Sequence, residues 1–277
     1  MEGKYVILKK NGDYKCKTEL TENDYKKLLN AAKILEEFNY LFFLGCNYIK
    51  AKDDFLNYNF SQFNVLETDM FSVMHNALNA IATNINMWET YLKRKYKDDK
   101  EIFPFQDDKN LGKSYFGLKD SEYYDNNVEY VVAKALRNMS THTEKPFSEI
   151  WYDDNYNRHF AIHTEHLLAN GNLNKSGKDI VLKSKKDYFD VIEVIKQAYE
   201  IVDKINNDMV NLLLKKDWMN FYSSRITIRD YIGFDWDGAY LVSENPKYSK
   251  EHMMFLNITN ISKNAMDNIL SIAAKSL

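Results

Sequence analysis

Apolar residues recur every three or four positions in four long stretches of the 277-residue chain. This spacing places them on one face of a helix, which is the pattern of an amphipathic helix. The stretches predict helices over residues 21–51, 61–96, 120–136 and 185–216. Thr21 at the start of the first stretch, with an acidic residue three positions later, has the spacing of a weak capping box. Scarce glycine (9) and proline (3) also favour long helices.

Strand-like patterns lie outside these helices. Residues 4–20 carry β-type residues on both sides of Asn11-Gly12, a pair typical of a two-residue hairpin turn. The segment from Arg158 onward alternates between two faces and predicts a strand that ends at Asn170-Gly171. Near the C-terminus, residues 224–234 and 238–243 read as strands and residues 253–259 are ambiguous. The final stretch, 262–277, reads as a short helix.

Together these elements predict a mainly α fold. Long helices are stabilised mainly by packing their apolar stripes together, so a bundle of four or more long helices is expected. A short N-terminal hairpin precedes the bundle and a small α+β segment follows it. The expected division is a helical domain over 1–216, hairpin included, and a C-terminal segment over 217–277 packed on the helical core.

Composition and charge narrow the classes of function. The net charge of −3 disfavours a protein that coats nucleic acid nonspecifically, although it leaves room for a local basic site. Cys16 and Cys46 have no zinc-type or redox-type spacing, which favours a reduced compartment. The most apolar stretch, 40–49, is too short to span a bilayer, and the N-terminus lacks the pattern of a signal peptide. We therefore expect a cytoplasmic protein without a membrane partner or a cofactor.

Candidate chemistry lies at the end of the third predicted helix, in ALRNMSTHTEKPF. Arg137 is followed at once by Asn138, and His142 comes five positions after the arginine. Histidine exchanges protons near neutral pH, and arginine presents a cationic fork that matches phosphate oxygens. The pair suits phosphoryl transfer on RNA, in which the ribose 2′-OH is the nucleophile and no metal is required. The alternative is structural, because both side chains can also cap the carbonyls at a helix end.

The five-residue spacing restricts how Arg137 and His142 can meet. On a continuous helix their side chains would lie about 140° apart. They converge only if the helix breaks between them, or if two copies of the segment face one cleft. Serine and threonine around His142 and the proline at position 146 favour a break between Asn138 and Pro146.

The segment LRNMSTH at the end of an amphipathic helix resembles the signature of the HEPN superfamily. The likeness covers residues 21–216 as helical architecture, but specific residues match only at 137–142. It implies a metal-independent endoribonuclease with a composite site across a homodimer, of the kind found in toxins and in abortive-infection and antiviral defence proteins. In that case His142 is the acid/base, Arg137 the phosphate ligand and Asn138 a polar orienter. Expected partners are an RNA substrate and an antitoxin or defence-system protein.

The chain departs from one subgroup of the family at Glu144. A subgroup of the family carries a tyrosine two positions after the histidine, which a partner nucleotidyltransferase modifies, but this chain has Glu144 there. That form of regulation is therefore not expected. The alternative function is a non-catalytic helical module that binds RNA, a nucleotide or a protein partner and uses Arg137 and His142 for structure.

A second arginine–histidine spacing occurs at Arg158 and His163. Because that segment reads as a strand without a helix leading into it, a second catalytic motif there is disfavoured. His159, His163 and His166 also raise the question of a metal site. On a strand, however, His166 faces away from the other two, so no metal site is expected.

Overall fold

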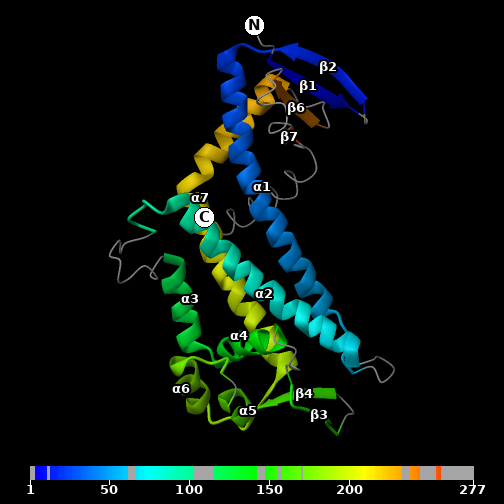
Figure 1. The fold of residues 1–277 in the computed structure, drawn as a ribbon, viewed down its shortest axis with the longest axis vertical. Helices are drawn as coiled ribbons and strands as arrows, with labels where there is room; N and C mark the ends of the chain where they lie inside the picture. Colours follow the sequence, from blue (N-terminus) through cyan, green and yellow to red (C-terminus); the bar gives the residue numbers. More distant parts are fainter. Residues whose placement is uncertain are drawn as a thin grey trace. The chain divides into compact units, whose positions relative to one another are not determined.

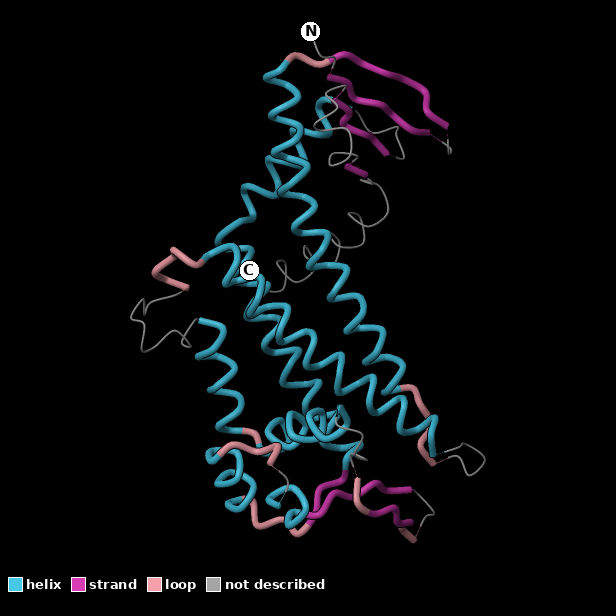
Figure 2. Tube along the Cα trace, viewed as in Figure 1, coloured by secondary structure: helices cyan, strands magenta, loops and turns pink. Residues whose placement is uncertain are grey.

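The computed structural model describes residues 4–10, 13–61, 67–102, 115–141, 147–154, 158–169, 171–232, 238–243 and 254–256. The described chain is mainly helical, as predicted (Figures 1 and 2). It forms two compact units. The first comprises Met1–Phe43 with Val210–Leu277, and the second comprises Leu44–Met209.

An antiparallel sheet in the first unit joins both ends of the chain. Strands β1 (Lys4–Lys10) and β2 (Asp13–Glu19) pair with Lys10 opposite Asp13, which confirms the predicted hairpin. Asn11-Gly12 lies outside the described residues. Strand β6 (Gly238–Ser243), also predicted, pairs with β1 on its other edge, and β7 (Met254–Leu256) pairs with β6. The order is β2-β1-β6-β7. The helix expected over 262–277 lies outside the described residues.

Two long helices contribute residues to both units. Helix α1 (Glu22–Leu56) begins as predicted, because the hydroxyl of Thr21 accepts the N–H of Asp24 at 3.1 Å and donates to its carboxylate at 2.7 Å. Helix α7 (Val191–Ile232) is longer than expected. A boundary between Lys216 and Asp217, as the sequence suggested, would fall inside α7.

The strand predicted over 224–234 is wrong, because α7 continues through Ile232. Phe221, Ser224 and Ile228 are buried at helical spacing, and the Thr227 hydroxyl donates to the Ser223 carbonyl one turn earlier at 2.9 Å. Packing of this face therefore outweighs the strand preference of the β-branched residues.

In the second unit, side-chain hydrogen bonds join α7 both to α2 and to α1. Helix α2 (Glu67–Tyr96) begins later than predicted, since Ser61 lies in a turn and residues 62–66 are outside the described part. The Trp88 indole donates to Asn206 Oδ1 on α7 at 2.7 Å. The Tyr48 hydroxyl donates to Asp203 Oδ1 at 3.0 Å, which joins α1 to α7.

The third predicted helix is in fact two. Helix α3 (Tyr115–Asn126) starts inside the stretch expected to be a loop, and α4 (Val128–Thr141) follows after one residue. That residue, Asn127, donates its side-chain amide to the Tyr123 carbonyl at 2.7 Å, and its own carbonyl accepts the N–H of Val131 at 3.2 Å. Asn127 thus ends one helix and begins the next, so the prediction of a single helix is wrong.

A second, three-stranded antiparallel sheet also lies in this unit. Its order is β3 (Glu149–Tyr152), β4 (Arg158–His163) and β5 (Tyr188–Asp190). The predicted strand is confirmed for β4 but wrong beyond it, because α5 (Thr164–Ala169) follows at once and α6 (Lys175–Lys183) comes next. The Thr164 N–H donates to the Asp187 carbonyl at 2.9 Å, which continues the β4–β5 pairing of His163 with Tyr188, and α5 begins at this residue.

Candidate functional site

Arg137 and Asn138 lie near the end of α4, held in place by the buried residues on either side of them. Leu136 and Met139 are fully buried, whereas Arg137 and Asn138 are only partly buried. The apolar stripe of α4 therefore fixes the backbone that carries the two polar side chains. The second unit thus presents both residues from a rigid element, as a site requires.

The guanidinium of Arg137 is not neutralised by any carboxylate in the described part of the chain. Its Nη1 donates to Asn138 Oδ1 at 3.3 Å, and its Nε is buried without a hydrogen-bond partner there. Buried polar groups normally have a partner. Arg137 therefore retains a donor and a positive charge that the described residues leave available.

The helix-capping alternative receives no support from the contacts of Arg137. The last carbonyls of α4 are bonded by hydroxyls instead: Ser140 donates to the Arg137 carbonyl at 2.9 Å, and Thr141 donates to the Asn138 carbonyl at 2.8 Å. The Arg137 side chain bonds its neighbour Asn138 and no carbonyl of the described residues.

His142 lies outside the described residues, as do positions 143–146. The last residue of α4 is Thr141, directly before His142. Convergence of Arg137 with His142 therefore stays a prediction, and so does the break in the helix.

Arg158 and His163 do not form a second copy of the motif. They stand at opposite ends of β4, five positions apart, so they face opposite sides of the sheet. Arg158 is buried against Tyr152 and Met70, whereas His163 Nε2 is 2.9 Å from Glu149 Oε2. The structure therefore does not bring Arg158 and His163 together.

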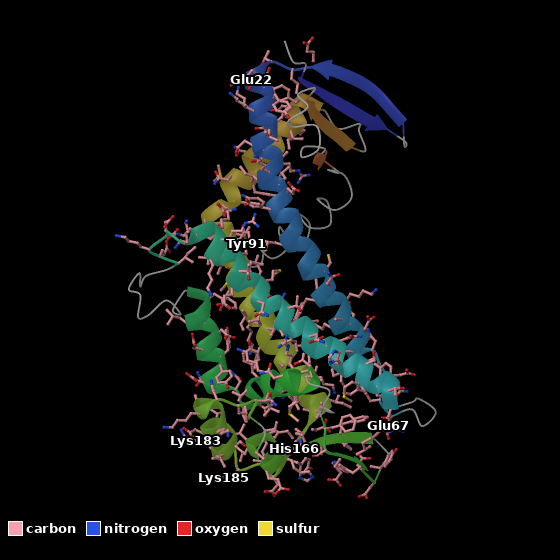
Figure 3. All side chains as sticks on the ribbon, viewed as in Figure 1. Glu22, Glu67, Tyr91, His166, Lys183 and Lys185 are labelled. Atoms are coloured by element: carbon pink, nitrogen blue, oxygen red, sulfur yellow. The ribbon has the colours of Figure 1, made fainter. Side chains whose placement is uncertain are left out.

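The three histidines of this region also do not gather. His159 and His163 lie on β4, while His166, labelled in Figure 3, lies on α5. Across the ranges that the structure describes, no group of three or more histidine, cysteine, aspartate or glutamate side chains is arranged to hold a metal ion.

His159 makes three close contacts that its sequence pattern does not predict. Its ring stacks on Trp151, with centroids 4.1 Å apart, and its Nδ1 is 2.6 Å from Asp190 Oδ2. Its Nε2 lies 3.5 Å from Asp153 Oδ2. Burial works against the charged ring, but the hydrogen bonds to Asp190 and Asp153 and their charges outweigh it and raise the pKa of His159.

Asp190 links this histidine to the start of α7. Its Oδ1 accepts the N–H of Ile192 at 2.9 Å and of Glu193 at 3.2 Å, as a helix-capping aspartate does. Asp190 and Glu193 also have the spacing of a capping box, which was the available sequence signal. No sequence signal predicts that His159, thirty-one positions earlier, pairs with Asp190.

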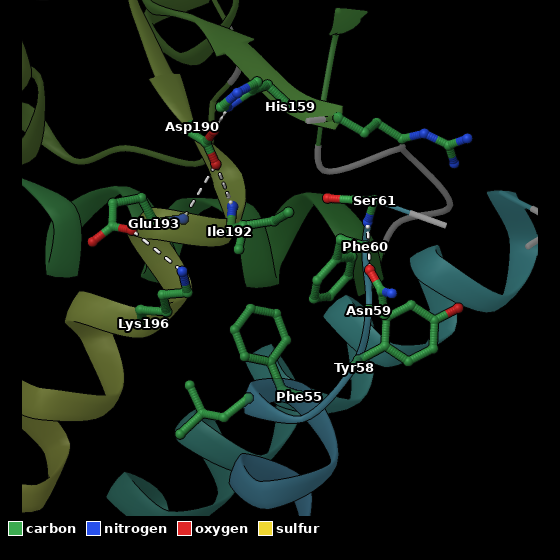
Figure 4. Close-up of a pocket in the computed structure, with 12 residues that line it drawn as sticks. Phe55, Tyr58, Asn59, Phe60, Ser61, His159, Asp190, Ile192, Glu193 and Lys196 are labelled. Carbon is green, nitrogen blue, oxygen red and sulfur yellow. Dashed lines mark hydrogen bonds and ion pairs between the residues drawn. The ribbon is translucent and has the colours of Figure 1, made fainter. Parts of the chain in front are cut away.

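A cavity of about 320 Å³ opens beside these residues (Figure 4). Its wall comes from three places in the second unit: the end of α1 with the turn after it, β4 with β5, and the first turns of α7. Phe55, Leu56, Phe60 and Ile192 supply the apolar part of the lining. The rest is polar or charged and consists of Tyr58, Asn59, Ser61, Arg158, His159, Asp190, Glu193 and Lys196.

No family model, curated protein or solved structure matches this chain. The likeness to the HEPN superfamily therefore rests on the helical pattern over residues 21–216 and, for specific residues, on Arg137, Asn138 and His142. Of the helices that the structure describes, none has a stretch long and apolar enough to cross a membrane.

Proposed function

We propose that the protein is a metal-independent endoribonuclease of the HEPN type, acting as a homodimeric toxin or antiviral defence effector. The observation that carries the proposal is the guanidinium of Arg137, which bonds Asn138 and has no acidic partner among the described residues. A positive charge left available in this way suits a phosphate ligand, because arginine presents a planar fork of donors to phosphate oxygens.

The proposed roles follow from the chemistry of RNA cleavage. The 2′-oxygen of the ribose bonds to phosphorus, and the bond from phosphorus to the 5′-oxygen breaks. One His142 accepts the proton of the 2′-OH, and the His142 of a second copy gives a proton to the leaving 5′-oxygen. Arg137 stabilises the charge that builds on the phosphorus oxygens, and Asn138 holds the guanidinium in place.

Two copies of the segment meeting at one cleft satisfy the geometry that a single helix does not. The RNA substrate and an antitoxin or defence-system protein are the proposed partners. Cytoplasmic localisation accords with an RNA substrate and with the scarcity of cysteine.

The direct test is incubation of purified protein with single-stranded RNA in excess EDTA, followed by analysis of the new ends. The proposal predicts cleavage with 2′,3′-cyclic phosphate and 5′-hydroxyl ends, at a rate that rises steeply with protein concentration below the dimer dissociation constant. Absence of cleavage, or cleavage that EDTA abolishes, contradicts it.

A further inference from the structure

A buried arginine in the second unit makes its direct contacts with uncharged groups. Arg158 is only 9% exposed. Its Nε donates to the Tyr152 hydroxyl at 3.1 Å, and its Nη1 lies 3.0 Å from the Met70 sulfur. The Tyr152 ring lies 5.6 Å from the guanidinium carbon. Among the residues that the structure describes, no carboxylate forms an ion pair with Arg158.

Burying the charge of the Arg158 guanidinium in this way costs free energy unless an anion pairs with it. An arginine does not lose its proton in a protein, so it cannot escape the cost of burial by becoming neutral. A thioether and a phenol are weak partners for a cation, and buried charges are normally paired. An anion bound to the Arg158 guanidinium would therefore stabilise the folded protein.

Tyr58 supplies a second unmet group in the same cavity. Its hydroxyl is buried and has no hydrogen-bond partner in the described chain. Burial raises the pKa of Tyr58, the charge of Asp69 raises it further, and the charge of Arg158 lowers it. Tyr58 and Arg158 both line the cavity, so the phenol and the guanidinium belong to one space.

The carboxylates in the cavity wall are already engaged. Asp190 bonds His159 and caps α7, and Glu193 lies 3.6 Å from Lys196. Neither is left to neutralise Arg158. His159 and Lys196 are the partners of these two carboxylates, so Arg158 is the charged group of the lining that no described carboxylate pairs.

We propose that the cavity binds a phosphate group, with the Arg158 guanidinium and the Tyr58 hydroxyl as its donors. A volume of about 320 Å³ is near the lower end for small-molecule sites. The apolar lining from Phe55, Phe60 and Ile192 offers a surface for the organic part of a phosphate monoester. The site uses none of the residues proposed for RNA cleavage, so phosphate binding and cleavage succeed or fail separately.

The test is isothermal titration calorimetry of the full chain with inorganic phosphate and, separately, with adenosine 5′-monophosphate. Wild type is compared with Arg158→Met, with Tyr58→Phe and with the control Arg94→Met, which removes an exposed arginine on α2. The wild type and Arg94→Met are expected to bind with equal affinity. Arg158→Met should bind at least about tenfold more weakly, since a hydrogen bond to a charged group is lost.

Tyr58→Phe keeps the test decisive if Arg158→Met does not fold. Removal of one hydroxyl should weaken binding several-fold and leave the melting temperature of the free protein near that of wild type. Tighter binding of the nucleotide than of inorganic phosphate assigns a monoester, and the reverse assigns free phosphate. Absence of binding by both probes, or equal affinity in wild type and Tyr58→Phe, overturns the proposal.

Discussion

His159 Nδ1 and Asp190 Oδ2 lie 2.6 Å apart, and the other carboxylate oxygen of Asp190 caps the first turn of α7. One carboxylate therefore joins a titratable ring on β4 to the start of a 42-residue helix. The stability of this joint depends on the charge of His159.

The unfolding free energy should depend on pH through His159. Its folded pKa is raised above the ordinary value of 6.5, so the folded state holds the proton more tightly than the unfolded state. The stabilisation is fully present below 6.5 and is lost as pH rises through the raised folded pKa. Urea unfolding from pH 6 to pH 9 should show this fall in wild type and a flatter profile in His159→Gln. Parallel profiles would show that the ring does not titrate differently on folding.

Asp190→Ala should destabilise the protein by about 1 kcal/mol or somewhat more, because α7 loses its cap and His159 loses an acceptor. Asp187→Ala is the matched control, since the Asp187 side chain is exposed and, among the described residues, the bond of Asp187 is made by its backbone carbonyl. Urea midpoints of the two variants check the difference. Equal midpoints would contradict the assignment of Asp190 as the cap.

Long apolar stripes explain why much of the fold could be predicted. The stripe of α2, the capped start of α1 and the Asn-Gly hairpin are local signals, and each gave the right type of element. The wrong predictions lie where contacts with other parts of the chain, or a single side-chain hydrogen bond, determine the secondary structure. At Ile228 a strand-like run packs as helix, and at Asn127 an amide divides a continuous stripe into two helices.

The candidate functional residues were also predictable only where the signal is local in the sequence. Arg137 and Asn138 could be selected from the sequence because the motif is contiguous. The cavity around Arg158 could not, since its wall combines segments about a hundred positions apart. The strand alternation of β4 correctly places His159 and His163 on one face, but it does not say which carboxylates they meet.

Asn206→Ala should destabilise the second unit by roughly 1–3 kcal/mol. Trp88 is 5% exposed, and its indole N–H would lose its acceptor on α7. The neighbouring residue Asn207 is exposed, so Asn207→Ala serves as the control. Guanidinium unfolding curves of the two variants make the comparison. A neutral effect of Asn206→Ala would mean that water replaces the amide.

Asn138→Ala should slow RNA cleavage by roughly 10- to 100-fold, because the Arg137 guanidinium loses the acceptor that orients it. Asn138 is partly exposed, so the melting temperature should change little. Initial rates and melting curves of the same preparation separate the two effects. A slower rate that merely follows a lower melting temperature would assign Asn138 a structural role, as the non-catalytic alternative requires.

The most direct measurement is the rate of RNA cleavage in EDTA by wild type, Arg137→Ala and His142→Ala. The matched controls are Arg94→Ala and His166→Ala, which remove exposed side chains of the same types on α2 and α5. We predict that both controls cleave at the wild-type rate, and that both motif variants lose at least about 100-fold while remaining folded. Full activity in Arg137→Ala and His142→Ala would contradict the account, as would a wild-type protein that cuts no RNA.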